Sequence, residues 1–155
     1  MRCATVLALS MLFHCTSPAW AQKIPPALVG VWAVGNPYDL GQPVGVNARQ
    51  ESYVRSLQIG YSPEFVYECG AKFAIESVEV KTWSVDEFRT RYNFSPESIG
   101  LKGAQIIEVS ISLLSGAKAC GKGEYMNPGR KIFIGGKRHI VIVVANDYFP
   151  LRKIG

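Results

Sequence analysis

Cysteines are the residues in this sequence with the most obvious capacity for chemistry. Of the four cysteines, Cys3 and Cys15 lie in an N-terminal segment that we expect to be removed, which leaves Cys69 and Cys120. A disulfide between these two would close a loop of about 50 residues, for which the chain-entropy estimate is roughly 4 kcal/mol. The alternatives are a nucleophilic cysteine, with His139 as its only available partner, and a metal site, for which no closely spaced ligand pair exists. We predict the disulfide, with no metal and no cofactor.

Paired carboxylates are the other arrangement that could support catalysis. Glu64 and Glu68 are four residues apart, but on a strand this spacing separates them by roughly 13 Å, too far to share a substrate proton. We interpret both as charges that face solvent. A single mature histidine and the lack of a phosphate-binding glycine loop predict a protein that is not an enzyme. The modest formal net charge of +5 and the lack of a known motif argue against nucleic acid as a partner.

The N-terminus has the layout of a secretory signal peptide. Arg2 precedes an apolar run over 4–13, and Ala-Trp-Ala over 19–21 places small residues where a signal peptidase requires them. The apolar run is about half of the roughly 20 residues that a membrane-spanning helix needs. We therefore expect cleavage after Ala21, a single domain over 22–155, no transmembrane segment after cleavage, and a periplasmic or secreted location.

The elements that would position these residues are mostly strands. The segment 35–50, rich in Gly, Pro and Asn, is predicted to be a long loop. Strand 105–114 would be half solvated, with Glu108 and its neighbouring serines facing water. The run 140–145 is apolar on both faces, which indicates a central strand or one that packs against the helix. Patterns typical of strands cover 28–34, 53–59, 64–69, 72–83 with a bulge near Glu76-Ser77, 105–114, and a hairpin over 131–153 that turns at Gly135-Gly136.

One helix is predicted between the two sets of strands. Ser84 and Glu87 have the spacing of a capping box, and Phe88 and Tyr92 fall on one helical face. A second short turn begins at Ser95-Pro96. About seven or eight short strands with one intervening helix predict a mainly β domain. Because an antiparallel sheet this small must protect its edges, we predict a monomeric barrel or strongly curved sheet with the helix across one end.

A resemblance supports the barrel. Gly30-Val31-Trp32 resembles the Gly-x-Trp start of lipocalin-like barrels. In that superfamily the tryptophan closes the barrel floor beneath a basic side chain from the end of the chain, which implies this role for Trp32 and for Arg152 or Lys153. The pieces LQIGYSPEFVYEC, DEFRTRYNFSPESIGL, CGKG and IFIGGKRHIVIVVANDYFPLRK are similar to small exported bacterial proteins of unassigned function. This second resemblance implies a fold and no catalytic residues.

These features predict a non-enzymatic binding protein of the cell envelope. A small apolar or amphipathic ligand would require an internal apolar cavity on the order of several hundred Å³. The alternative is an inhibitor or immunity-type protein that blocks an exported partner such as a cell-wall hydrolase, which a filled core with a protruding loop would favour. Tyr38, Tyr125 and Met126 lie in predicted loops, where they either anchor a partner or tuck over the barrel end. The basic residues of 131–153 either protect strand edges or meet an acidic partner or membrane surface.

Overall fold

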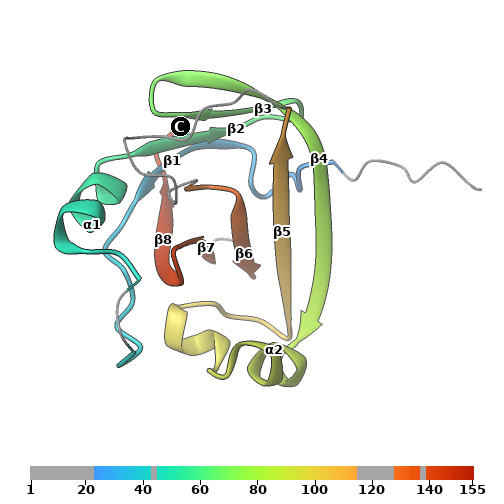
Figure 1. The fold of residues 1–155 in the computed structure, drawn as a ribbon. Coiled ribbons are helices and arrows are strands. Elements are labelled where there is room, and N and C mark those ends of the chain that lie inside the picture. The colour runs from blue at the N-terminus through green and yellow to red at the C-terminus, as the bar shows by residue number, and fades with distance from the viewer. Residues whose placement is uncertain (1–22, 43–44, 115–127, 137–138) are drawn as a thin grey trace, which may run out of the picture.

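Eight antiparallel strands wrap into a closed barrel, which confirms the predicted mainly β fold (Figure 1). The computed structural model describes residues 23–42, 45–114, 128–136 and 139–155. Each strand pairs with its neighbours in sequence order, and β1 also pairs with β8. The strands are β1 Gly30–Val34, β2 Gln58–Tyr61, β3 Phe65–Glu68, β4 Ala71–Ser84, β5 Gln105–Leu113, β6 Lys131–Gly135, β7 His139–Val144 and β8 Asp147–Lys153.

Side chains that point inward from all eight strands form one buried cluster, which we call the inner core. Ile59, Val66, Ile132 and Phe149 are among its fully buried members. Long apolar runs such as β7 contribute to this core with every second residue. The intervening residues of β7 are also buried or half-buried, as the two-sided apolar pattern of 140–145 predicted.

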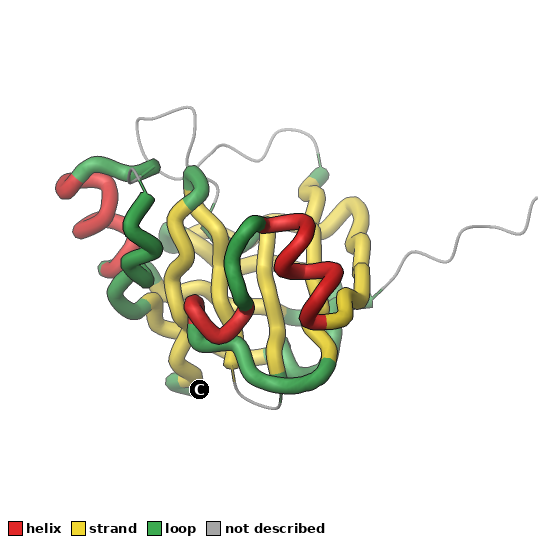
Figure 2. Tube along the Cα trace, turned by 90° about the horizontal axis from the view of Figure 1, so that it is seen from below, coloured by secondary structure: helices red, strands yellow, loops and turns green. Residues whose placement is uncertain are grey.

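A second cluster lies on the outside of the barrel and is called the outer core. Helix α2, Val85–Tyr92, and the 3₁₀ turn η1, Pro96–Ile99, lie across the strands in Figure 2. They cover outward-facing side chains of β5, β6 and β7, and not an end of the barrel as we expected. The members of the outer core are Phe88, Ile99, Leu101, Ile106, Phe133 and Val141.

The predicted capping box of α2 is confirmed. The Ser84 hydroxyl accepts a hydrogen bond from the Glu87 amide at 3.3 Å, and the Glu87 carboxylate accepts one from the Ser84 amide at 2.8 Å. Asn93, at φ 61°, ends the helix. The predicted turn after Ser95 is η1, and Gly100, at φ 71°, ends it.

The strand predicted over 53–59 is wrong. Helix α1, Ala48–Arg55, occupies this region, and β2 begins only at Gln58. Asn47 accepts a hydrogen bond from the Gln50 amide at 3.0 Å, and the Gln50 side chain accepts one from the Asn47 amide at 2.9 Å. This second capping box starts the helix inside what we predicted to be loop, and the helix turns Val54 toward the inner core.

One detail of the strands agrees with the prediction and one differs. The bulge near Glu76-Ser77 is confirmed by a register shift between Ile75 and Ser77 in β4. The turn between β6 and β7 starts one residue later than predicted, because Gly135 still pairs with His139. Gly135 instead allows a close approach, since a Cβ there would lie 2.9 Å from the Lys102 backbone nitrogen.

Among the described residues, no helix has the length and apolar composition needed to cross a membrane.

Candidate functional site

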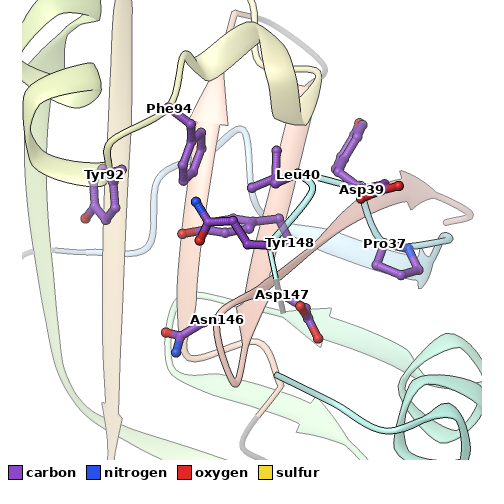
Figure 3. A pocket seen from close by; sticks show the side chains of 10 residues that line it. Pro37, Asp39, Leu40, Tyr92, Phe94, Asn146, Asp147 and Tyr148 are labelled. Atoms are coloured by element: carbon purple, nitrogen blue, oxygen red, sulfur yellow. The ribbon is translucent and has the colours of Figure 1, made fainter. Parts of the chain in front are cut away.

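An open groove on the outside of the barrel gathers aromatic and amide side chains, and we call it the outer groove (Figure 3). Its volume is about 480 Å³. One wall comes from the segment 37–42, and the other from Tyr92 and Phe94 at the end of α2. The floor is formed by Asn146, Asp147 and Tyr148 at the turn between β7 and β8.

The floor exists because β7 and β8 are joined by a tight turn. Val144 pairs with Asp147, so Ala145 and Asn146 form a two-residue loop with φ angles of 49° and 73°. Left-handed angles at both central residues are typical of a type I′ hairpin turn, and asparagine tolerates them better than most residues. This turn places the exposed Asn146 side chain at the edge of the groove.

The chain around the segment 37–42 is tied to the same hairpin. The Tyr38 amide donates a hydrogen bond to the Tyr148 carbonyl at 2.9 Å. The Asp147 carboxylate accepts hydrogen bonds from the amides of Gly45 at 3.1 Å and Val46 at 2.8 Å. Gly45 must be glycine, because a Cβ there would lie 1.5 Å from the Ala145 carbonyl oxygen. These contacts hold the wall of the groove against its floor.

Aromatic rings form a continuous layer beneath and beside the groove. The Phe94 ring meets the Tyr148 ring edge-on at 4.9 Å, and the buried Phe133 ring lies nearly parallel to Tyr148 at 6.3 Å. Tyr92 contacts Phe133 at 5.0 Å and Phe88 at 4.6 Å. Edge-to-face and offset pairs of this kind stabilise a fixed ring arrangement by about 0.5–1.5 kcal/mol each. The rings that face the groove are therefore held in place by the outer core.

Glu108 anchors this aromatic layer. We predicted that it faces solvent, but it is buried on the outer side of β5, beneath α2. Its carboxylate accepts hydrogen bonds from the Trp83 indole at 2.8 Å and the Tyr92 hydroxyl at 2.7 Å, and it pairs with Lys131 at 3.2 Å. Burial alone would raise the pKa of Glu108, but the donors Tyr92, Trp83 and Lys131 together lower it. Glu108 therefore stays charged beneath the helix.

Glu68 is the second correction to the predicted carboxylates. Glu64 is exposed as expected, but Glu68 is only 1 % exposed and points into the barrel. The Arg130 guanidinium donates to its carboxylate at 2.5 Å, and the Tyr61 hydroxyl lies nearby, donating to the Gly129 carbonyl at 3.1 Å. Burial raises the pKa of Glu68, and Arg130 opposes that rise. This buried pair offers no second carboxylate for acid–base chemistry.

Trp32 and Lys153 meet at one end of the barrel. Trp32 is buried and donates its indole N–H to the Leu28 carbonyl at 2.8 Å. The Lys153 ammonium lies 5.7 Å from the Trp32 ring centroid and donates to the Val29 carbonyl at 3.2 Å, whereas Arg152 is exposed on the other side of β8. Gly30 makes room for this lysine, since a Cβ there would lie 2.7 Å from the Lys153 side chain.

The remaining predicted residues are spread over the molecule. Cys69 lies in the exposed turn between β3 and β4 with a φ angle of 54°, and its sulfur is 3.3 Å from the Tyr53 hydroxyl. Cys120, Tyr125 and Met126 lie outside the described residues, as does the predicted signal peptide. Tyr38 is half-buried against Gly100 and lines the outer groove.

No protein-family model, curated protein or solved structure matches the chain.

The groove contains residues that the sequence analysis missed. Phe94, Asn146 and Tyr148 belong to different elements, and only the covering of β5–β8 by α2 brings them together. One signal was available: Phe133, Val141 and Val143 are apolar on the side of their strands that should face solvent. Apolar residues on both faces of neighbouring strands indicate that another element covers the outer face. A groove can then form along the edge of that covering element.

Proposed function

We propose that this protein is a non-enzymatic binding domain that holds a small amphipathic ligand in the outer groove. The observation that carries the proposal is the contrast between the two faces of the barrel wall. Side chains from every strand pack together in the inner core, whereas the outer groove offers about 480 Å³ beside ordered aromatic rings. Small-molecule sites typically have volumes of about 300–1,000 Å³ and combine apolar walls with a few polar groups. The proposed ligand site is therefore the outer groove on the outside of the barrel.

The chemistry of the groove suits an amphipathic molecule. Leu40, Phe94 and the ring of Tyr148 provide apolar surface, and the exposed side chains of Gln42 and Asn146 provide hydrogen-bonding amides. Two other hollows, over β1–β3 and beside Trp83, are more open and gather fewer aromatic rings. The outer groove is the better candidate because hydrogen bonds hold the segment 37–42 to the β7–β8 hairpin and a ring contact holds Phe94 against Tyr148.

Export and a Cys69–Cys120 disulfide form part of the same proposal. The N-terminal pattern supports a periplasmic or secreted protein, and Cys69 lies at the exposed turn between β3 and β4. The proposed relationship to small exported lipocalin-like proteins rests on the Gly30-x-Trp32 resemblance and on the closed barrel.

The inhibitor or immunity-type function is the second candidate. The buried inner core favours it, because an inhibitor presents surface loops to another protein and needs no internal ligand cavity. The exposed residues of the segment 37–42 would then contact the exported partner.

Native mass spectrometry of the mature protein from its own compartment tests the proposal. We compare the wild type with Gln42→Trp, which fills the groove, and with Gln105→Trp, a matched change at an exposed position outside it. A small molecule retained by the wild type and Gln105→Trp, but lost from Gln42→Trp, is the expected result. The intact mass also reports whether the two cysteines are oxidised.

Other outcomes separate the alternatives. A ligand that remains on Gln42→Trp would place the binding site elsewhere and contradict the groove. A protein bound in stoichiometric amount would support the inhibitor function. A wild-type protein that takes up no molecule from the extract of its compartment would contradict ligand binding.

A further inference from the structure

The outer groove has an unusual charge for this chain. The sequence contains 17 lysines and arginines against 12 aspartates and glutamates. Within the described lining of the groove, however, Asp39 and Asp147 are the charged residues, and no lysine, arginine or histidine is present. An anionic ligand would meet carboxylates without a counter-charge, so the lining selects against anions.

The negative charge reaches the floor of the groove. Burial raises the pKa of Tyr148, and the carboxylates of Asp147 and Glu108 raise it further. The Asp147 carboxylate lies close to the floor because the amides of Gly45 and Val46 donate hydrogen bonds to it there. Lys131 balances the charge of Glu108 at 3.2 Å, so the Asp147 carboxylate is the one that makes the potential beside the Tyr148 ring favourable for a cation.

The rings add a second attraction for a cation. The Phe133 ring lies nearly parallel to the Tyr148 ring with centroids 6.3 Å apart, and Tyr148 and Phe94 both line the groove. The faces of aromatic rings carry negative charge density and attract ammonium groups. The same aromatic layer already holds one ammonium group, because Lys131 lies 4.9 Å from the Tyr92 centroid and 3.2 Å from the Glu108 carboxylate.

We propose that the outer groove binds a small organic cation, an alkylammonium or arylammonium compound, with its cationic group against the Tyr148 and Phe94 rings. This inference rests on the proposed function and specifies its ligand class. Asp39 supplies the counter-charge at the rim, where one of its oxygens accepts from the Gly41 amide at 2.8 Å and the residue is exposed to solvent. The amides of Gln42 and Asn146 orient the polar end of the molecule.

A titration with three probes of the same shape tests the inference. Choline, the neutral isostere 3,3-dimethylbutan-1-ol and the anion 3,3-dimethylbutanoate are added at constant ionic strength and followed by amide chemical shifts. We expect choline to shift the amides of 92–94 and 146–148 and to bind about tenfold more tightly than the neutral isostere, because a desolvated cation–π contact is of this order. The anion should bind more weakly than either.

Charge variants separate the local effect from the overall charge. Asp39→Asn should weaken choline binding about threefold and leave the neutral isostere unchanged, since a partly exposed ion pair contributes little more than this. Asp86→Asn is the matched control, because Asp86 is an exposed acid on α2 that pairs with Arg89 outside the groove. Choline binding should be unchanged in the control.

The outcomes distinguish this inference from the proposal beneath it. Equal affinities for choline and the neutral isostere, with chemical-shift changes at the groove, would contradict the preference for a cation. The groove would still be a binding site. Tighter binding of the anion would contradict the same preference. If none of the probes shifts the groove amides, the cation inference is overturned, and the mass-spectrometric comparison of Gln42→Trp decides separately whether the groove binds another kind of molecule.

Discussion

The two buried glutamates lie on opposite sides of the barrel wall and are held in different ways. Glu68 points into the inner core, where Arg130 is its ion-pair partner. Among the described residues, one carboxylate oxygen of Glu68 and Nε of Arg130 are buried without a hydrogen-bond partner. Glu108 points outward beneath α2, and three side chains donate to it. Burial raises the pKa of Glu68, whereas the donors around Glu108 lower its pKa despite burial.

The difference teaches that the number of donors, and not burial alone, decides how a carboxylate contributes to stability. A buried ion pair with unmet polar atoms recovers little of the free energy that desolvation costs. A carboxylate with a donor for each oxygen keeps its charge and fixes the elements that supply those donors. Glu108 joins β4, α2 and β6 in this way, and so supports the rim of the outer groove.

The largest effect should come from breaking the inner pair. Glu68→Met leaves Arg130 without its counter-charge, and we expect the free energy of unfolding to fall by about 3 kcal/mol. The value lies at the low end for buried pairs because the Arg130 side chain is 19 % exposed. Urea denaturation measures the change, and Glu64→Met, at an exposed neighbouring position, is the control.

The double variant sharpens this test. Glu68→Met combined with Arg130→Met removes both charges and both unmet polar atoms, and it should recover most of the lost stability. A double variant as unstable as Glu68→Met would show that the pair itself stabilises the barrel.

A smaller loss is expected at the outer carboxylate. Glu108→Gln keeps the shape but replaces one acceptor oxygen by a donor amide. Either Lys131 then loses Oε1 or both Trp83 and Tyr92 lose Oε2. We expect a loss of about 2 kcal/mol in the free energy of unfolding, since hydrogen bonds to charged groups contribute about 1.5–3 kcal/mol. Glu79→Gln, at an exposed glutamate paired with Lys81, should change stability by less than about 0.5 kcal/mol. Equal losses at the two positions would contradict the role of Glu108.

The smallest expected effect concerns pH: the contributions of Glu108 and Glu68 to the free energy of unfolding should change in opposite directions as pH falls. The pKa of Glu108 lies below its ordinary value of 4.5, so its contribution is present above pH 4.5 and is lost as pH falls through the folded-state pKa. The pKa of Glu68 lies above 4.5, so its protonation favours the folded state as pH falls through the folded-state pKa toward 4.5. The loss caused by Glu108→Gln should therefore shrink in acid.

Glu68→Gln provides the comparison for the pH series. Because this variant lacks the stabilising protonation, its loss relative to the wild type should grow as pH falls from neutrality toward 4.5. Urea denaturation of the wild type and both variants at several pH values measures the two slopes. Slopes of the same sign would show that the two sites do not differ as described.

Much of the fold could be predicted because its signals are local. The capping box at Ser84, the bulge near Glu76-Ser77 and the two-sided apolar run of β7 each depend on a few neighbouring residues. The strand predicted over 53–59 failed where two local signals competed. The Asn47 and Gln50 capping box favoured a helix, and the chance alternation after Tyr53 favoured a strand.

The site could not be predicted because it depends on contacts between distant segments. Asp147 acts on amides about a hundred residues away in sequence, and Glu68 meets Arg130 only when the barrel is closed. The spacing of Glu64 and Glu68 gave no indication that one would be buried and the other exposed. The inward or outward direction of each side chain follows from strand register, which the pattern of one strand alone does not determine.

The pairing of β1 with β8 has a consequence for how the protein forms. Lys153 and Val29, which meet at this seam, are 124 residues apart. Contacts of such separation demand a large loss of chain entropy before they contribute any stability, so we expect the hairpins to assemble first and the seam last. Until then β1 and β8 each expose an unpaired edge, and a chaperone that shields nascent strands would have most to protect at these two.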